Sequence, residues 1–168
     1  MIKLTRFDGV SVEVKAPLIV RVRQTNATVL KEHGNSRVDG LVVPFYMDQP
    51  QTIADAVHAE IKTFTSLNQP GGKPVWFDGA KASGPVPLTS VNRLRLKEGK
   101  ANSALQIGNA IQLVSNSPEE VFKLISDMGG NPEPPIDNSK FSKMETSNKA
   151  DGIETPLWDE AMYTVPAS

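Results

Sequence analysis

The sequence repeats itself at a fixed distance of 70 residues. Phe7-Asp8-Gly9 returns as Phe77-Asp78-Gly79, and Pro17-Leu18 returns as Pro87-Leu88. Further along, Gln49-Pro50-Gln51-Thr52-Ile53 returns in outline as Ser117-Pro118-Glu119-Glu120-Val121. A chain that writes one short unit twice is expected to fold as two similar modules. A fused, pseudo-symmetric pair of this kind is more typical of a building block than of a catalyst.

The first unit reads as a series of short strands followed by a helix. Apolar and polar residues alternate over residues 2–7 and again over residues 10–14, which predicts two half-buried strands. Asp8-Gly9 between them predicts a hairpin with a type I′ turn. Further strands are predicted at residues 18–23, 28–31 and 41–45, with residues 33–40 as a polar loop. A helix is predicted from Pro50, since Ile53, Ala54, Val57 and Ile61 follow at helical spacing.

The second unit repeats this order. Strands are predicted at residues 75–77, 91–96, 104–107 and 110–114, and Ser83-Gly84-Pro85 predicts a shorter or bulged second strand. Ser117 and Glu120 form the pattern of a capping box around Pro118, which predicts the start of a helix. Gly129-Gly130 is expected to end that helix.

The chain is therefore expected to be α+β and mainly β. We predict two tandem small antiparallel β units, each closed by one short helix, followed by an extended C-terminal arm. The expected boundaries are 1–67 for the first unit, 68–74 for a linker rich in glycine, 75–130 for the second unit and 131–168 for the arm.

The arm differs in character from both units. It opens with three prolines and continues with polar residues that show no sustained period. It nevertheless carries spaced apolar residues, namely Phe141, Met144, Ile153, Leu157, Trp158, Met162 and Tyr163. A solvating linker has little use for such side chains, so we expect them to bind a partner protein. The alternative is that the arm wraps back onto its own core.

Parts of each unit resemble a known family. The opening Ile2-Lys3-Leu4-Thr5-Arg6-Phe7-Asp8-Gly9 and the closing Ser117-Pro118-Glu119-Glu120-Val121 are similar to the flagellar FlbD/SwrD (swarming-motility) type of domain, a short β-rich unit ended by a helix. The resemblance covers about one repeat at a time and none of the arm. Such proteins are single short units, whereas this chain is doubled. Its architecture is also similar to head decoration and minor capsid proteins of tailed bacteriophages.

The sequence offers little for catalysis or metal binding. There is no cysteine, and the two histidines, His33 and His58, do not stand in an H-E-x-x-H pattern. Neither G-x-S-x-G nor the glycine patterns of phosphate-binding loops occur. Glu119-Glu120 is explained by helix capping, because adjacent residues do not face each other on a helix. We expect no enzyme activity, no cofactor and no metal.

One charge pattern could bind nucleic acid. Basic residues alternate with apolar ones in the third predicted strand of each unit, at Arg21, Arg23, Arg93, Arg95 and Lys97. Such rows could contact phosphates. The alternative is the solvated face of a half-buried sheet, and no aromatic residues are interleaved for base stacking. The formal net charge of −1 gives no overall attraction to nucleic acid.

These observations favour a structural protein over a catalyst. We expect a virion component, such as a capsid decoration or minor structural protein of a tailed phage, whose partners are other protein subunits, for example the major capsid protein. A nucleic-acid-binding or regulatory module is the alternative. The opening residues do not form a signal peptide and no run of 18 apolar residues occurs, so we expect the virion or the host cytoplasm and no membrane.

Overall fold

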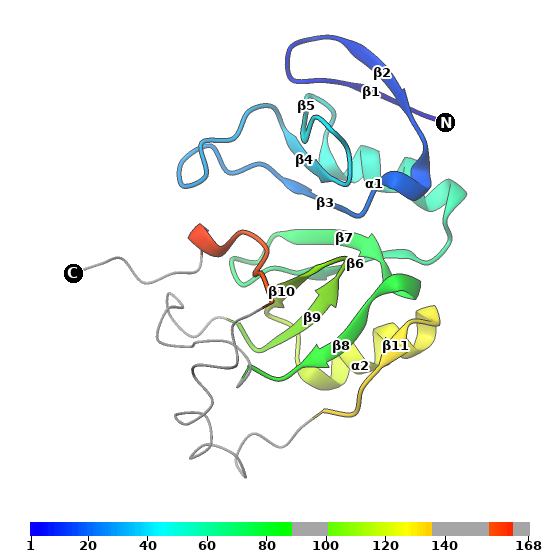
Figure 1. Cartoon of the computed structure of the whole chain (residues 1–168), viewed down its shortest axis with the longest axis vertical. Helices are drawn as coiled ribbons and strands as arrows, with labels where there is room; N and C mark the ends of the chain where they lie inside the picture. The colour runs from blue at the N-terminus through cyan, green and yellow to red at the C-terminus, as the bar shows by residue number, and fades with distance from the viewer. Residues whose placement is uncertain (89–100, 136–154, 163–168) are drawn as a thin grey trace, which may run out of the picture.

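The computed structural model of the chain describes residues 1–88, 101–135 and 155–162 (Figure 1). These ranges contain mostly antiparallel strands and two 11-residue α-helices, which confirms the expected α+β, mainly β class. No helix within them is long and apolar enough to cross a membrane.

The first hairpin forms where the sequence predicts it, but with another turn. β1 (Ile2–Thr5) pairs antiparallel with β2 (Ser11–Val14). Gly9 has a φ of 88°, whereas Asp8 keeps a negative φ, so the turn is not type I′. Gly9 N donates to Arg6 O and Arg6 N donates to Val10 O, at 2.9 and 2.8 Å. This is a longer hairpin loop with glycine in the left-handed position, where a side chain would be strained.

A five-stranded sheet follows, in the order β5-β4-β3-β7-β6. Its members are β3 (Arg21–Gln24), β4 (Ser36–Asp39), β5 (Phe45–Tyr46), β6 (Phe64–Asn68) and β7 (Pro74–Asp78). The prediction was wrong in the middle of this unit, because β4 lies in the expected loop 33–40. Residues 27–30, where a strand was expected to begin at residue 28, form a turn. Of the strand predicted at residues 41–45, only Phe45 has strand structure. The polar residues of β4 look like a loop in sequence, yet their partners on β3 are polar too.

The expected linker 68–74 is instead the turn of a hairpin. β6 and β7 pair from Phe64↔Asp78 to Asn68↔Pro74, and Gly72 N donates to Gln69 O at 2.8 Å inside the turn. β7 also pairs with β3, so the first strand of the second unit completes the sheet of the first. Glycine and proline suit a tight turn as well as a linker, and the flanking strands decide between the two.

The second unit forms a four-stranded sheet in the order β10-β9-β8-β11. Its members are β8 (Ser83–Val86), β9 (Ser103–Ile107), β10 (Ala110–Val114) and β11 (Asn131–Pro132). The predicted bulge in β8 is confirmed by a register shift between Ser83 and Val86. Asp78-Gly79 is not a hairpin turn here, because Asp78 caps a 3-10 turn at Gly79–Lys81. The predicted strand 91–96 lies outside the described residues.

Two apolar cores flank the β6–β7 hairpin. Trp76 and Phe64 pack in the first core, beneath α1 (Pro50–Glu60). Leu67 and Phe77 pack in the second, beneath α2 (Pro118–Met128). Because successive side chains of a strand point to opposite faces, one hairpin serves both cores. The two repeats are therefore joined through a shared element.

The two helices begin alike but are capped differently, which provides a matched test. Ser117 accepts a hydrogen bond from Glu120 N in a complete capping box, whereas Gln49 makes no side-chain cap for α1. We expect Ser117→Ala to lower the free energy of unfolding by about 1 kcal/mol, because a donor at the helix start loses its partner. Gln49→Ala should change it little. Urea unfolding measures both, and equal losses would contradict the assignment.

Candidate functional site

The most unusual feature of the structure is a buried cluster of ionised side chains. Three arginines face three carboxylates, and we call this set the ion cluster: Arg21, Arg23, Arg37, Glu32, Asp39 and Asp159. The side chains of Arg21 and Arg23 are 0% and 1% exposed, and only Arg37 reaches the surface. The positive and negative charges are equal in number, so the cluster is neutral as a whole.

Strand pairing positions most of the ion cluster. Val22 points into the first core, so its neighbours Arg21 and Arg23 lie on the other face of β3. Arg21 stands opposite Asp39 of β4, and its Nε donates to that carboxylate at 2.8 Å. Arg23 stands opposite Arg37 in the same register. These two like charges can lie side by side because carboxylates lie between and beside them.

Glu32 contributes the second carboxylate from the loop before β4. Its two oxygens accept from Arg23 Nη1 and Nη2 at 2.8 and 2.6 Å, which is a bidentate pair. Oε2 also accepts from Arg37 Nη1 at 3.2 Å, and Oε1 accepts from the backbone N–H of Asn26 at 2.7 Å. The ion cluster therefore fixes the path of the loop between β3 and β4.

Asp159 contributes the third carboxylate from the far end of the chain. Its oxygens accept from Arg21 Nη1 and Nη2 at 2.8 and 3.1 Å, and from Arg23 Nε and Nη2 at 2.9 Å each. Asp159 has a φ of 56°, a left-handed conformation that aspartate tolerates better than most residues. Gln112 of β10 completes the surroundings of Arg21, accepting from Nη1 at 2.5 Å.

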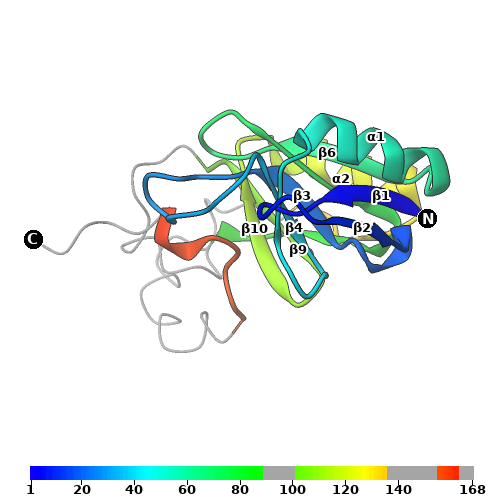
Figure 2. The same ribbon diagram turned by 90° about the horizontal axis from the view of Figure 1, so that it is seen from above.

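The segment that carries Asp159 is bound to the body over residues 155–162. In Figures 1 and 2 this segment (red) lies at the opposite end of the molecule from the N-terminus. Ile111 N donates to Pro156 O and Trp158 N donates to Ile111 O, both at 2.8 Å, which adds a short parallel bridge at the edge of β10. The Trp158 indole N–H donates to Ile107 O at 3.0 Å, and its ring lies 4.2 Å from the guanidinium carbon of Arg21. Leu157 and Met162 pack against a small core beneath β9 and β10.

The surroundings favour the charged forms of Asp159 and Glu32. Burial alone would raise the pKa of Asp159, but hydrogen bonds from Arg21 and the charges of both arginines outweigh it and hold this pKa below its usual value. Burial also raises the pKa of Glu32, but hydrogen bonds, chiefly from Arg23, outweigh it, so this pKa is lowered as well. For Arg37 the pKa is raised, because Asp39 and Glu32 overcome the effect of burial.

The structure corrects the two sets of residues predicted from sequence as far as it describes them. Arg21 and Arg23 are not on a solvated face, because the second unit and the C-terminal segment cover that face of β3; they are not available to nucleic acid. Leu157, Trp158 and Met162 bind their own chain, which is the alternative considered for the arm. The remaining predicted residues lie outside the described ranges: Arg93, Arg95, Lys97, Phe141, Met144, Ile153 and Tyr163.

Sequence reasoning found only Arg21 and Arg23 and missed most of the site. Glu32, Arg37, Asp39, Gln112 and Asp159 were not singled out. A signal for one pair was present, because Arg37-x-Asp39 alternates around Val38 just as Arg21-x-Arg23 alternates around Val22. Two strands that each alternate charged residues with valine would predict that the paired strands share one charged face of the sheet. No local pattern distinguishes Asp159 from the other acidic residues of the arm.

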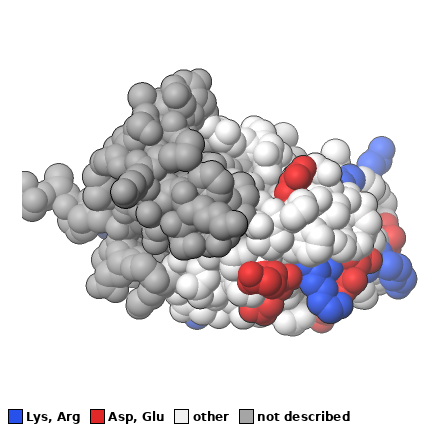
Figure 3. Space-filling view, turned by 90° about the horizontal axis from the view of Figure 1, so that it is seen from below, with Lys and Arg blue, Asp and Glu red and all other residues white. Residues whose placement is uncertain are grey.

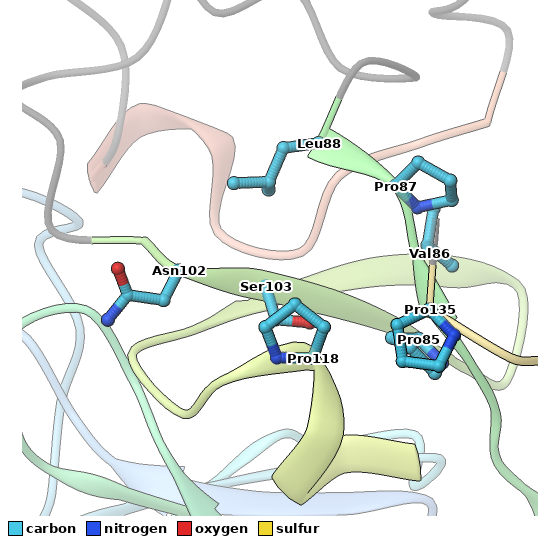
Figure 4. A pocket seen from close by; sticks show the side chains of 8 residues that line it. All are labelled: Pro85, Val86, Pro87, Leu88, Asn102, Ser103, Pro118 and Pro135. Carbon is cyan, nitrogen blue, oxygen red and sulfur yellow. The ribbon is translucent and has the colours of Figure 1, made fainter. Parts of the chain in front are cut away.

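The hollows near this region differ greatly in size. An open hollow of about 430 Å³ lies beside the docked segment, where Glu32, Arg37 and Phe45 face Trp158 and Asn109. A much smaller crevice of about 10 Å³ lies between prolines at Ser103, the first residue of β9 (Figure 4). That volume suits about one water molecule, so the crevice is not a ligand site. Among the described residues no group of three or more His, Asp or Glu could hold a metal ion.

An aromatic cluster lies near the open hollow. Phe7 stacks on His33 with ring centroids 5.6 Å apart, and both rings meet Phe45 edge-on at 6.2 Å. Met47 stands two residues after Phe45, and Met47 N donates to Thr5 O while Phe7 N donates to Phe45 O. Phe7 and Met47 are 43% and 45% exposed. We call these four residues the aromatic surface.

Charge on the opposite part of the molecule is mixed. Figure 3 shows acidic and basic side chains next to each other on the described part of the lower face. Lys123 and Asp127 of α2 form one such exposed pair at 2.8 Å. Mixed charge of this kind offers no continuous track for a phosphate backbone on that part of the face.

Comparisons with known proteins leave the family open. No protein-family model matches the chain, and no curated protein or solved structure matches it. The resemblance of each repeat to the FlbD/SwrD-type domain therefore stays a prediction, and the functional argument rests on the geometry.

Removing the charge of Asp159 tests the ion cluster. We expect Asp159→Asn to lower the free energy of unfolding by about 3 kcal/mol, because it leaves an uncompensated positive charge among buried arginines. Asp127→Asn, in the exposed pair with Lys123, should leave it unchanged within error. Urea unfolding followed by tryptophan emission measures both variants. Equal effects would show that the cluster does not stabilise the fold.

The lowered pKa values of Asp159 and Glu32 predict how stability depends on pH. The unfolded chain titrates these groups near their ordinary values of about 4, whereas the native protein holds them ionised to lower pH. At pH values between the native and the unfolded pKa, the unfolded chain binds more protons than the native protein. The free energy of unfolding therefore falls as the pH falls. Their stabilisation is fully present above about pH 5 and is lost progressively below about pH 4.

Unfolding in urea at several pH values between 3 and 7 checks this dependence. Asp159→Asn should give a flatter profile at acid pH, whereas Glu13→Gln, at an exposed position of β2, should follow the unmodified chain. Parallel profiles for all three proteins would exclude Asp159 as a source of the acid sensitivity.

Proposed function

We propose that the protein is a non-enzymatic structural or assembly component, most specifically a capsid decoration or minor structural protein of a tailed phage. The observation that carries the proposal is the distribution of exposed apolar side chains. In the described ranges, the large hydrophobic residues with high exposure all fall within residues 1–47: Met1, Phe7, Val10, Leu18, Val29, Val42 and Met47. Phe7 and Met47 of this set belong to the aromatic surface, and exposed apolar side chains that lie together mark surfaces that bind other proteins.

The aromatic surface is the part of this region best suited to a protein partner. Phe7 and Phe45 present rigid rings, and the Arg37 guanidinium lies 5.8 Å from the centre of the Phe45 ring. Aromatic residues, methionine and arginine are the types enriched at protein interfaces. The ring contacts among Phe7, His33 and Phe45 hold the surface in one arrangement, which reduces the entropy lost on binding.

This surface takes over the role that we expected of the C-terminal arm. Leu157, Trp158 and Met162 serve the fold of their own chain, so in this state they are not free to anchor it to a neighbour. The phage assignment draws on the similarity of a duplicated β body to small virion proteins, and the partner would be another capsid subunit, such as the major capsid protein.

The nucleic-acid alternative has lost the support of Arg21 and Arg23. Both guanidinium groups are buried and hydrogen-bonded to carboxylates, so they are not accessible to phosphate. The alternative depends only on Arg93, Arg95 and Lys97, which lie outside the described residues.

The proposal is tested with tagged variants in the organism that encodes the chain. We expect the unmodified protein to copurify with phage-like particles, and Phe7→Ser/Met47→Ser to reduce its copy number per particle at least tenfold. Leu18→Ser is the matched control, because Leu18 is similarly exposed at 52% but lies at the other end of the β1–β2 hairpin. Quantitative mass spectrometry of purified particles measures all three.

Two results would contradict the proposal separately. Absence of the unmodified protein from particles would reject the virion role. Equal incorporation of the double variant and the Leu18→Ser control would reject the aromatic surface as the interface.

A further inference from the structure

The C-terminal segment docks on the body of the chain in the way that a short peptide docks on the edge of a sheet. The backbone of Ile111 is paired on both sides, with its N–H donating to Pro156 O and its C=O accepting from Trp158 N. Adding an extended peptide to the edge of a sheet is a recurrent way of binding peptides, in which main-chain hydrogen bonds supply affinity and side-chain sites supply specificity. Here the edge belongs to β10.

Three successive side chains of the segment each make their own contacts with the body. Leu157 is held by the small core that contains Ile111 and Leu113. The Trp158 indole combines a hydrogen bond to Ile107 O with stacking over Arg21. Asp159 places its carboxylate between two guanidinium groups. The site therefore selects an apolar residue, an indole and a carboxylate in that order.

Nothing in these contacts requires the peptide to come from the same chain. All are non-covalent, and residues 136–154 separate the docked segment from Pro135, the last described residue before it. Nineteen residues can span at most about 65 Å when fully extended, which is more than the diameter of a small domain. The same segment of a neighbouring copy could therefore reach the site.

We infer that the site exchanges this segment between copies, so that residues 155–162 of one chain dock on β10 and the ion cluster of a second. Exchange of an identical element creates an interface without any new kind of contact, because each site binds the same segment, now supplied by the other copy. A tether gives a local concentration in the millimolar range, so the chain's own segment dominates in dilute solution. Exchange becomes favoured where copies are concentrated. This goes beyond the proposed function and holds whether or not the protein belongs to a virion.

The first experiment asks whether the site accepts the segment from outside. The full-length chain with Trp158→Ala/Asp159→Asn keeps the site but disables its own segment. A fluorescein-labelled peptide of residues 154–163 should bind this variant saturably in fluorescence polarisation. The same peptide with asparagine at Asp159 should bind at least tenfold more weakly, and the unmodified chain should bind the peptide far less, because its own segment competes.

The second experiment asks whether a second copy is the occupant. Sedimentation of the unmodified chain from micromolar to millimolar concentration should reveal a dimer, which Trp158→Ala/Asp159→Asn should abolish. Leu18→Ser should leave the dimer intact, since it alters an exposed apolar residue away from the site. If the double variant does not fold, Leu157→Ser replaces it in both experiments, because it removes an apolar contact and leaves the charges balanced.

Three outcomes would overturn the inference. The labelled peptide could fail to bind a folded variant, which would show that the site holds the segment only within one chain. It could bind equally with asparagine in place of Asp159, which would remove the ion cluster from recognition. The unmodified chain could remain monomeric at millimolar concentration, which would exclude a second copy as the occupant.

Discussion

The burial of Arg21 and Arg23 is the constraint on which the rest of the structure depends. A guanidinium group does not lose its proton in a protein, so the charge cannot be removed when the side chain is buried. It has to be matched by carboxylates with good hydrogen-bond geometry. The chain brings them from three places: the loop before β4, β4 itself and the C-terminal segment. Two arginines on one short strand thereby fix a loop, the neighbouring strand and the C-terminal segment.

The duplicated sequence does not produce two independent domains because one hairpin is shared. β6 and β7 present Phe64 and Trp76 to the first core, and Leu67 and Phe77 to the second. The second repeat therefore begins with a strand that belongs to the sheet of the first. Phe-Asp-Gly marks the end of the opening strand in both copies, but leads to a hairpin turn in one and a capped 3-10 turn in the other. The repeat in sequence predicts equivalent positions, not equivalent pairing.

Elements whose signals are local could be predicted from the sequence. The first hairpin, both helices, the capping box at Ser117 and the β9–β10 hairpin depend on spacings of a few residues. β4 could not be recognised, because its polar residues are explained only by the charged partners opposite them on β3. The burial of Arg21 was even harder to predict from the sequence, since its partner Asp159 lies 138 residues away in the chain. An alternating basic strand looks the same in sequence whether water or a carboxylate faces it.

Docking of the C-terminal segment completes the ion cluster, because the buried charges of Arg21 and Arg23 need the carboxylate of Asp159. If residues 155–162 leave, Arg21 and Arg23 lose the carboxylate of Asp159, and water must hydrate the two guanidinium groups in its place. The left-handed backbone of Asp159 opposes docking by about 1–2 kcal/mol. Each hydrogen bond to a charged group contributes about 1.5–3 kcal/mol, and four of them converge on this carboxylate. The strained conformation is therefore maintained by the arginines, and the arginines remain buried because of it.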